Sequence, residues 1–266
     1  MEHTMILTGL AVGIAFGFIL QRGRFCVTNA FRNVWVARSG TWITAFLLVI
    51  AVQAIGVTAL TQLDLIHLSW GPLPWLGVIV GGLLFGVSIV LAGGCATGTW
   101  FRSGEGLVGS WIALIFYAIG AAAMKHGSLS GVNASVRSFT VPVTTIPALG
   151  ISAWIPTVVL ALVVGVLVWR QLRKPARKVA TLPPERTGLA HWLFEAPWQP
   201  FLTATLISVI AIITYPLSEA TGWHAGLGIT TPTGNLLEWT VTGDTSYIDW
   251  GVLLVIGILV GSFIAA

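Results

Sequence analysis

The chain has 266 residues, of which 56% are hydrophobic and only 8% are charged. A soluble domain carries about 25% charged residues, and the mean hydropathy here is +0.90, so the composition excludes an ordinary soluble domain and predicts an integral membrane protein. The formal net charge of +4 reflects loop charge in such a protein and does not indicate a nucleic-acid partner.

Apolar runs in the sequence predict the membrane-spanning helices. A helix needs about 20 residues to cross the hydrocarbon core, and several runs reach this length. The runs before Cys26 and Cys95 are shorter and end at breaks that contain glycine. We therefore predict an all-α, polytopic membrane protein. In chain order, the runs cover residues 5–20, 41–62, 75–92, 107–124, 145–169, 198–218 and 248–266.

The first part of the chain contains an internal repeat, with copies at about 9–50 and 78–119. Many transporters are built from repeats, and their interrupted helices form the substrate site near the middle of the membrane. We therefore place the candidate site at the two cysteine segments. With a shift of 69 residues, Gly13, Phe16, Gly17 and Cys26 align with Gly82, Phe85, Gly86 and Cys95.

The two cysteine segments read RGRFCVTNAFR from residue 22 and GGCATGTWFR from residue 93. Non-helical backbone at membrane depth is tolerated only where it faces protein or a cavity. We therefore predict in each segment a break, as in a re-entrant helix, followed by a short helix. The free N–H groups at the start of such a helix attract anions.

Within these segments, Cys95, which has the most permissive glycine context, is the candidate central thiol, and Cys26 is the second candidate thiol. A protonated thiol is a soft donor that suits a sulfur-bearing anion, whereas a thiolate would repel the anion or attack a disulfide-like sulfur. The residue pattern does not fix the protonation state of the two thiols. It also allows a second interpretation, in which the cysteines only pack the interior and the arginines only anchor the helix ends on the cytoplasmic side. The candidate lining residues are Gly94, Thr97, Gly98, Thr99, Asn29, Arg24 and Arg102.

Basic residues predict the orientation. The segment RQLRKPARK from residue 170 is the strongest basic loop, and such loops stay in the cytoplasm. We thus predict a first membrane half at 1–169, a cytoplasmic linker at 170–197 and the start of a second half at 198–266. The N-terminus is then external, and Lys125 and Arg137 are the two basic residues of thirteen that fall outside. Because the last apolar run has no polar cap, we expect the polypeptide to continue beyond residue 266.

Motifs for enzymatic chemistry are missing from the sequence. There is no C-x-x-C pair for redox relay or zinc binding, no phosphate-binding Gly-x-x-x-x-Gly-Lys-Ser/Thr motif, and no ligand-like spacing of histidines. We predict no metal, no cofactor and no enzymatic activity.

The stretches QRGRFCVTNAFR and LAGGCATGTWFR resemble the YeeE/YedE family of sulfur-compound transporters, and within it the thiosulfate importers. The resemblance implies a multi-pass protein of the bacterial inner membrane with an hourglass-like helical fold. It implies that cysteines relay thiosulfate through S–H···S contacts, with Cys26 and Cys95 as two of them and a third beyond residue 266. It also implies a small cytoplasmic partner, a TusA-like sulfur carrier (TsuB).

The function predicted from the sequence is therefore import of thiosulfate across a lipid membrane, through a pathway lined by cysteine thiols. One alternative is transport of another sulfur or selenium species. Others are a membrane thiol oxidoreductase or sulfurtransferase, and a passive channel.

Overall fold

The structure is a computed structural model that describes residues 2–67, 71–142, 152–174, 187–223 and 226–266. In these ranges the regular secondary structure is helical, apart from one isolated β-bridge between Leu73 and Val141. The helices are α1 (Glu2–Gly23), α2 (Val27–Trp35), α3 (Thr41–Gln62), α4 (Trp75–Leu91), α5 (Ala96–Gly104), α6 (Val108–Lys125), α7 (Ser130–Arg137), α8 (Trp154–Leu172), α9 (Gly188–Phe194), α10 (Pro200–Glu219), α11 (Thr230–Thr242), the 3-10 turn η2 (Thr245–Tyr247) and α12 (Trp250–Ala265).

The predicted all-α polytopic fold is confirmed. Among the described residues, six stretches are long and apolar enough to cross a membrane, and α12 is a shorter apolar helix. The apolar run predicted at 41–62 has the same bounds as α3. Part of the run predicted at 145–169, residues 145–151, lies outside the described residues, and α8 begins at Trp154.

Three further helices were not predicted from the sequence. Both α7 and α11 are rich in Ser, Thr, Asn and Gly, which are poor helix formers, so neither stands out as an apolar run. The helix α9 lies inside the segment 170–197 that the sequence indicates as a linker. Tertiary contacts rather than local propensity explain such elements.

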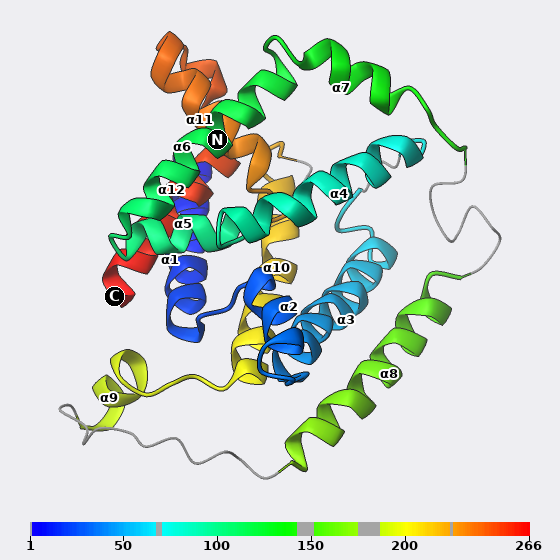
Figure 1. The fold of residues 1–266 in the computed structure, drawn as a ribbon, viewed down its shortest axis with the longest axis vertical. Coiled ribbons are helices and arrows are strands. Elements are labelled where there is room, and N and C mark those ends of the chain that lie inside the picture. The colour runs from blue at the N-terminus through cyan, green and yellow to red at the C-terminus, as the bar shows by residue number, and fades with distance from the viewer. Residues whose placement is uncertain (1, 68–70, 143–151, 175–186, 224–225) are drawn as a thin grey trace.

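The helices α1 and α12, the first and last that the structure describes, make the most extensive helix contact in it (Figure 1). A Cβ atom at Gly13 or Gly17 would collide with the backbone of α12 at Leu254 or Ile258, and one at Gly257 would lie 2.8 Å from the Gly13 Cα. Small residues four apart let two membrane helices approach to backbone contact. The glycines of α1 therefore permit this packing.

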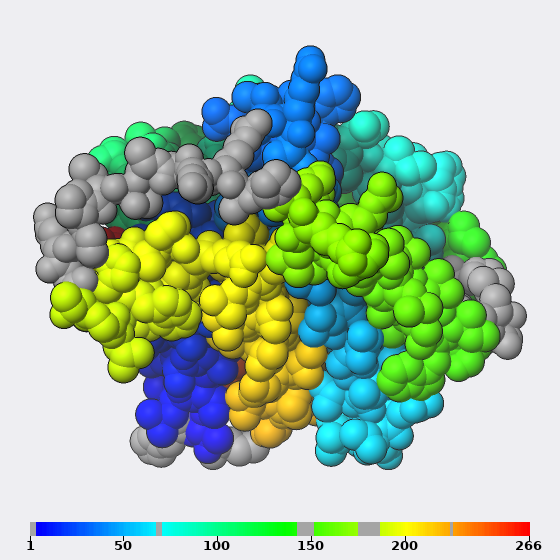
Figure 2. All heavy atoms as spheres, turned by 90° about the horizontal axis from the view of Figure 1, so that it is seen from below, coloured from blue at the N-terminus to red at the C-terminus, as the bar shows by residue number. Residues whose placement is uncertain are grey.

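The other helices build outward from this pair. Figure 2 shows α10, in yellow to orange, between α1 in dark blue and α3 in lighter blue, and these contacts are extensive. On the far side of α3 lies α8, at the edge of the bundle (Figure 1). The short helix α5 packs on α6 and α12, and α11 packs on α6. The core at their meeting point contains both cysteines together with Phe16, Leu20, Phe101, Trp250, Leu254 and Ile258.

The helix α4 differs from its repeat counterpart α1. None of its residues is buried, and the space around a Cβ at Gly82 or Gly86 is open to 4 Å. The aligned glycines of the two repeats thus have different surroundings: Gly13 and Gly17 face a helix, whereas those of α4 face open space.

Candidate functional site

Each cysteine lies at a helix break, directly before a short helix. After α1 ends at Gly23, the chain turns at Arg24, whose φ of 49° is in the left-handed region, and α2 begins after Cys26. After α4 ends, it turns at Gly93, with φ 68°, and α5 begins after Cys95. Glycine adopts the left-handed conformation without a steric penalty, which explains Gly93; Arg24 adopts it at an energetic cost.

The two breaks bring the thiols together. The Sγ atoms of Cys26 and Cys95 lie 3.9 Å apart, and both cysteines are free. Cys26 is only 3% exposed and Cys95 only 7%, so the pair is shielded from solvent. Because both cysteines are N-cap residues, the positive ends of the α2 and α5 dipoles meet at this point.

Glycine at position 98 makes this contact sterically feasible. The Gly98 N–H donates a hydrogen bond to the Cys95 Sγ at 3.4 Å. A Cβ on Gly98 would lie 2.9 Å from the Cys26 Sγ and 3.6 Å from the Cys95 Sγ. The first distance is shorter than a normal carbon–sulfur contact, so any larger residue at 98 would displace the Cys26 thiol.

We expect Gly98→Ala to lower the free energy of unfolding by about 1–3 kcal/mol, since it forces one methyl group into a packed site. Thermal unfolding of the detergent-solubilised protein measures the loss. The control is Gly109→Ala, because a Cβ at Gly109 meets nothing within 4 Å. Equal unfolding temperatures of the two variants would mean that the thiol site accommodates the added methyl group.

Other residues predicted for the site are engaged by protein groups. The Thr99 hydroxyl donates to the Cys95 carbonyl at 3.0 Å, and Asn29 accepts a hydrogen bond at 2.9 Å from Asn33, one turn along α2. Thr97 is half-buried in the first turn of α5. Of the predicted set, then, the structure brings Cys26, Cys95 and Gly98 into contact and leaves the hydroxyl and amide groups on the helices around them.

Both predicted arginines brace the breaks. The guanidinium of Arg102 donates to the carbonyl of Gly93 and lies close to the buried Gly94, so it closes the turn before Cys95. Arg24 lies 3.6 Å from Glu105, whose side chain is only 8% exposed while that of Arg24 is 70% exposed. This ion pair joins the first break to the end of α5.

The sequence interpretation missed α11, whose side chains form hydrogen bonds with α5 and α6. The buried Trp100 donates its indole N–H to the Thr233 hydroxyl at 3.0 Å. Tyr117 of α6 donates similarly to Thr230. The run of threonines at the start of α11 was the available signal, but its partners are more than 100 residues away in the chain.

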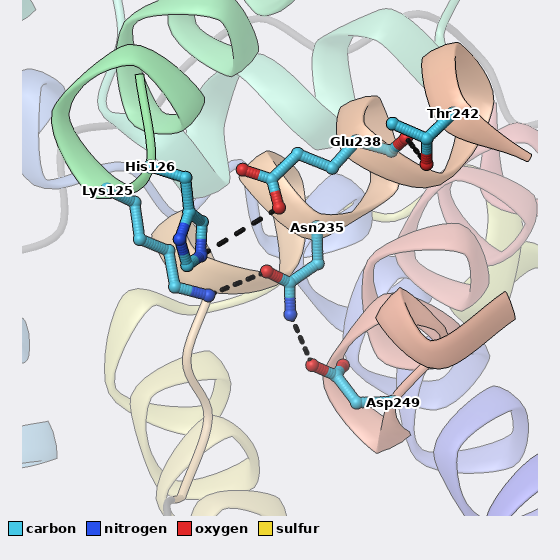
Figure 3. A network of polar contacts seen from close by, with 6 residues as sticks. All are labelled: Lys125, His126, Asn235, Glu238, Thr242 and Asp249. Carbon is cyan, nitrogen blue, oxygen red and sulfur yellow. Dashed lines mark hydrogen bonds and ion pairs between the residues drawn. The ribbon is translucent and has the colours of Figure 1, made fainter. Parts of the chain in front are cut away.

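A second network ties α11 to α6 and α12, and Figure 3 shows it. Lys125 donates to the Asn235 side-chain oxygen at 2.8 Å, and the Asn235 amide donates to Asp249 at 2.6 Å. Asp249 also accepts the Val252 N–H at 2.8 Å and so caps α12. Beside it, His126 lies 3.9 Å from Glu238. The network fixes the end of α6 and the start of α12 against the middle of α11.

Among the described residues, no cluster of three or more His, Cys, Asp or Glu side chains could hold a metal ion. The arrangement at the cysteines offers instead two soft sulfur atoms and N–H groups at two helix starts. These are groups that can bind an anion with a soft atom and release it.

Comparison with known proteins gives consistent findings. The profile of a family described as "Sulphur transport" matches residues 22–266. A protein of Escherichia coli K12 named "Thiosulfate transporter TsuA" is 51% identical over 264 residues, covering 99% of this chain and 75% of that protein. A protein of the same name from Spirochaeta thermophila is 32% identical over 276 residues, covering 98% and 78%. A "Probable transporter YedE" of Salmonella typhimurium is 38% identical over 122 residues, covering 44% and 29%. All are named as transporters, which supports transport rather than an enzymatic reaction.

Proposed function

We propose that this chain, which belongs to the sulphur transport family, imports thiosulfate across a bacterial inner membrane. The chain is a multi-pass membrane protein and a transporter of sulfur compounds. Two relatives align with nearly all of this chain, and their names support thiosulfate as the substrate.

The observation that carries this proposal is the pair of buried thiols at two helix starts, 3.9 Å apart. Thiosulfate has a terminal sulfur that is soft and polarizable, and oxygens that accept hydrogen bonds. A protonated thiol donates to the terminal sulfur, and N–H groups of the first helical turn donate to the oxygens. Since neither bond is covalent, the ion binds weakly enough to leave, as transport requires.

In this arrangement the ion reaches Cys95 first and passes to Cys26. A sulfur atom does not fit between two Sγ atoms that are 3.9 Å apart, so the thiols have to separate as the ion passes. The first turns of α2 and α5 are the parts that yield, because a single added atom at Gly98 would already meet the Cys26 Sγ. Arg24 and Arg102 keep the breaks in shape, while Thr97, Thr99 and Asn29 line the neighbouring turns.

The orientation and the division of the chain belong to the same proposal. In it the N-terminus is external, 1–169 is the first membrane half, 170–197 is a cytoplasmic linker, and 198–266 is the start of the second half. The basic segment 170–197 is the proposed contact for a small cytoplasmic TusA-like sulfur carrier, to which the imported ion is passed.

Uptake of labelled thiosulfate into cells without importers of their own tests the proposal. We expect saturable uptake that excess unlabelled thiosulfate suppresses and sulfate does not, because sulfate lacks the soft terminal sulfur. Sulfite, sulfide and selenium compounds complete the competition series. A selenium compound that competes better than thiosulfate would assign the substrate to that class instead.

Two further outcomes of the same assay separate the other classes of function. Uptake that rises linearly with concentration would indicate a passive channel. A persulfide that persists on Cys95 during turnover would indicate a sulfurtransferase, since a relay through hydrogen bonds leaves both thiols unmodified.

A further inference from the structure

The short helix α9 belongs to the segment 170–197, and contacts with the end of α1 fix its position. The Phe194 ring packs edge-on against Phe18, with 5.8 Å between the ring centroids. The Arg22 guanidinium donates a hydrogen bond at 3.0 Å to the carbonyl of Ala196, just past the end of α9. Figure 1 shows α9 on the side of the molecule where α1 and α8 end and α10 begins. The helix α9 is therefore docked on the bundle.

The depth of α9 relative to a membrane follows from the helices that it adjoins. Both α10 and the stretch that includes α1 are long and apolar enough to cross a membrane. Phe18 lies five residues before the end of α1 at Gly23, a distance of about 7.5 Å at the helical rise. Only residues 195–199 connect α9 to the start of α10. The helix α9 is thus held at the level of the last two turns of α1, where a spanning helix leaves the lipid.

The outward face of α9 is apolar. Leu189 is 79% exposed and Trp192 is 44% exposed, and Leu193 is half-buried. Residues three and four apart share one side of a helix, so these three side chains form a single face. His191 and Glu195, which are 2.7 Å apart, lie on another side. Leucine and tryptophan on one face of a short amphipathic helix are typical of helices that lie in the membrane interface.

The aromatic residues around α9 support the same level. The Trp192 ring stacks on the buried Trp198 at 5.0 Å, and the Trp198 indole N–H donates to the Trp192 carbonyl at 2.9 Å. At the end of α8, the exposed Trp169 has the Arg173 guanidinium 3.7 Å from its ring centroid. Tryptophan is enriched where membrane helices meet the headgroup region. The end of α8 and α9 thus both carry an exposed tryptophan on one side of the molecule.

We propose that α9 is a membrane-surface helix, whose face of Leu189, Trp192 and Leu193 inserts into the lipid leaflet on the side where α1 ends. Because α9 is held at this level, lipid is the medium next to that face, and insertion removes its apolar surface from water. The sulfur carrier proposed above then contacts the basic residues of 170–197 and leaves this face to lipid. That the leaflet is cytoplasmic rests on the orientation in the proposed function; the insertion itself does not.

Spin labelling of the whole chain in liposomes of phosphatidylethanolamine and phosphatidylglycerol tests the insertion. A nitroxide label is attached at Leu189→Cys, on the proposed lipid face, and in a matched variant at His191→Cys, on the polar side. Collisions with oxygen, which concentrates in lipid, and with a water-soluble nickel chelate give the depth of each label. Both native cysteines are buried, and the parent protein gives their background. Size-exclusion chromatography shows that each labelled variant keeps the fold of the parent.

We expect the label at position 189 to lie about 5–10 Å below the lipid phosphates, where oxygen reaches it and the nickel chelate does not. The label at position 191 is expected at the level of the phosphates or above, with the opposite preference. Equal access of the nickel chelate to both labels would overturn the proposal, because α9 would then stand in water. Poor access of both reagents to position 189 would also overturn it, because protein would then cover this face.

The side of the membrane is measured separately. A membrane-impermeant maleimide is expected to react with His191→Cys in inside-out vesicles and to leave it unmodified in intact cells. Reaction in intact cells would overturn the cytoplasmic assignment of the leaflet and the orientation in the proposed function, while the depth measurement would still decide the insertion. The two proposals therefore fail in different experiments.

Discussion

Thiosulfate uptake falls about 100-fold in Cys95→Ala, the largest effect on transport that we expect from a single substitution. In the proposed function the buried Cys95 thiol, at the start of α5 and 3.9 Å from the Cys26 Sγ, donates a hydrogen bond to the ion. A hydrogen bond to a charged group contributes about 1.5–3 kcal/mol, and each 1.4 kcal/mol corresponds to a factor of about ten. Initial rates of labelled-thiosulfate uptake, at matched membrane levels, measure the effect.

Two comparisons show whether the loss is chemical or structural. Cys95→Ser keeps a donor but replaces the soft sulfur by oxygen, so we expect uptake between that of the parent and that of Cys95→Ala. Removing one sulfur atom leaves only a small cavity, so the thermal stability of Cys95→Ala in detergent is expected to stay close to that of the parent. Uptake by Cys95→Ala equal to that of the parent would reduce the cysteine pair to a packing feature.

Gly17→Leu is expected to have the largest effect on stability. A Cβ at Gly17 already collides with the backbone of Ile258 in α12, and leucine adds three more carbon atoms at a site where backbone cannot yield. Overpacking by single methylenes costs about 1–3 kcal/mol, so we expect a loss beyond this range and little folded protein. Size-exclusion chromatography and thermal unfolding of the detergent-solubilised protein measure it.

The repeat provides a matched control for this substitution. Gly86 aligns with Gly17, but a Cβ there meets nothing within 4 Å. Gly86→Leu is therefore expected to leave the folded fraction and the unfolding temperature near those of the parent. Equal damage from both substitutions would show that helix propensity or membrane insertion, rather than contact with α12, governs these glycines.

Sequence reasoning was most successful where chemistry is local. The cost of polar backbone in lipid makes spans visible as apolar runs, and 41–62 was predicted with the bounds of α3. The breaks before the short helices were predicted because glycine and polar residues interrupt such runs at Cys26 and Cys95.

Sequence reasoning was least successful where contacts between residues far apart in the chain determine the surroundings of a residue. Hydrophobicity all round α1 and α4 does not distinguish a face that packs on a helix from one that faces lipid, so the different surroundings of Gly17 and Gly86 could not be predicted. Nor could the support of α5 by α11, because Thr233 is 133 residues from Trp100. The short distance between the two Sγ atoms likewise depends on how packing in the core positions the two helix breaks.

The pairing of α1 with α12 also sets a waiting time during synthesis. The indole of Trp250 donates to the Thr8 hydroxyl at 3.1 Å across a separation of 242 residues. At about 5–20 residues per second, the first helix is made roughly 12–50 s before its partner emerges. For that period the face of α1 that carries Gly13 and Gly17 lacks its partner helix, and the core around the two thiols lacks Leu254 and Ile258 of α12.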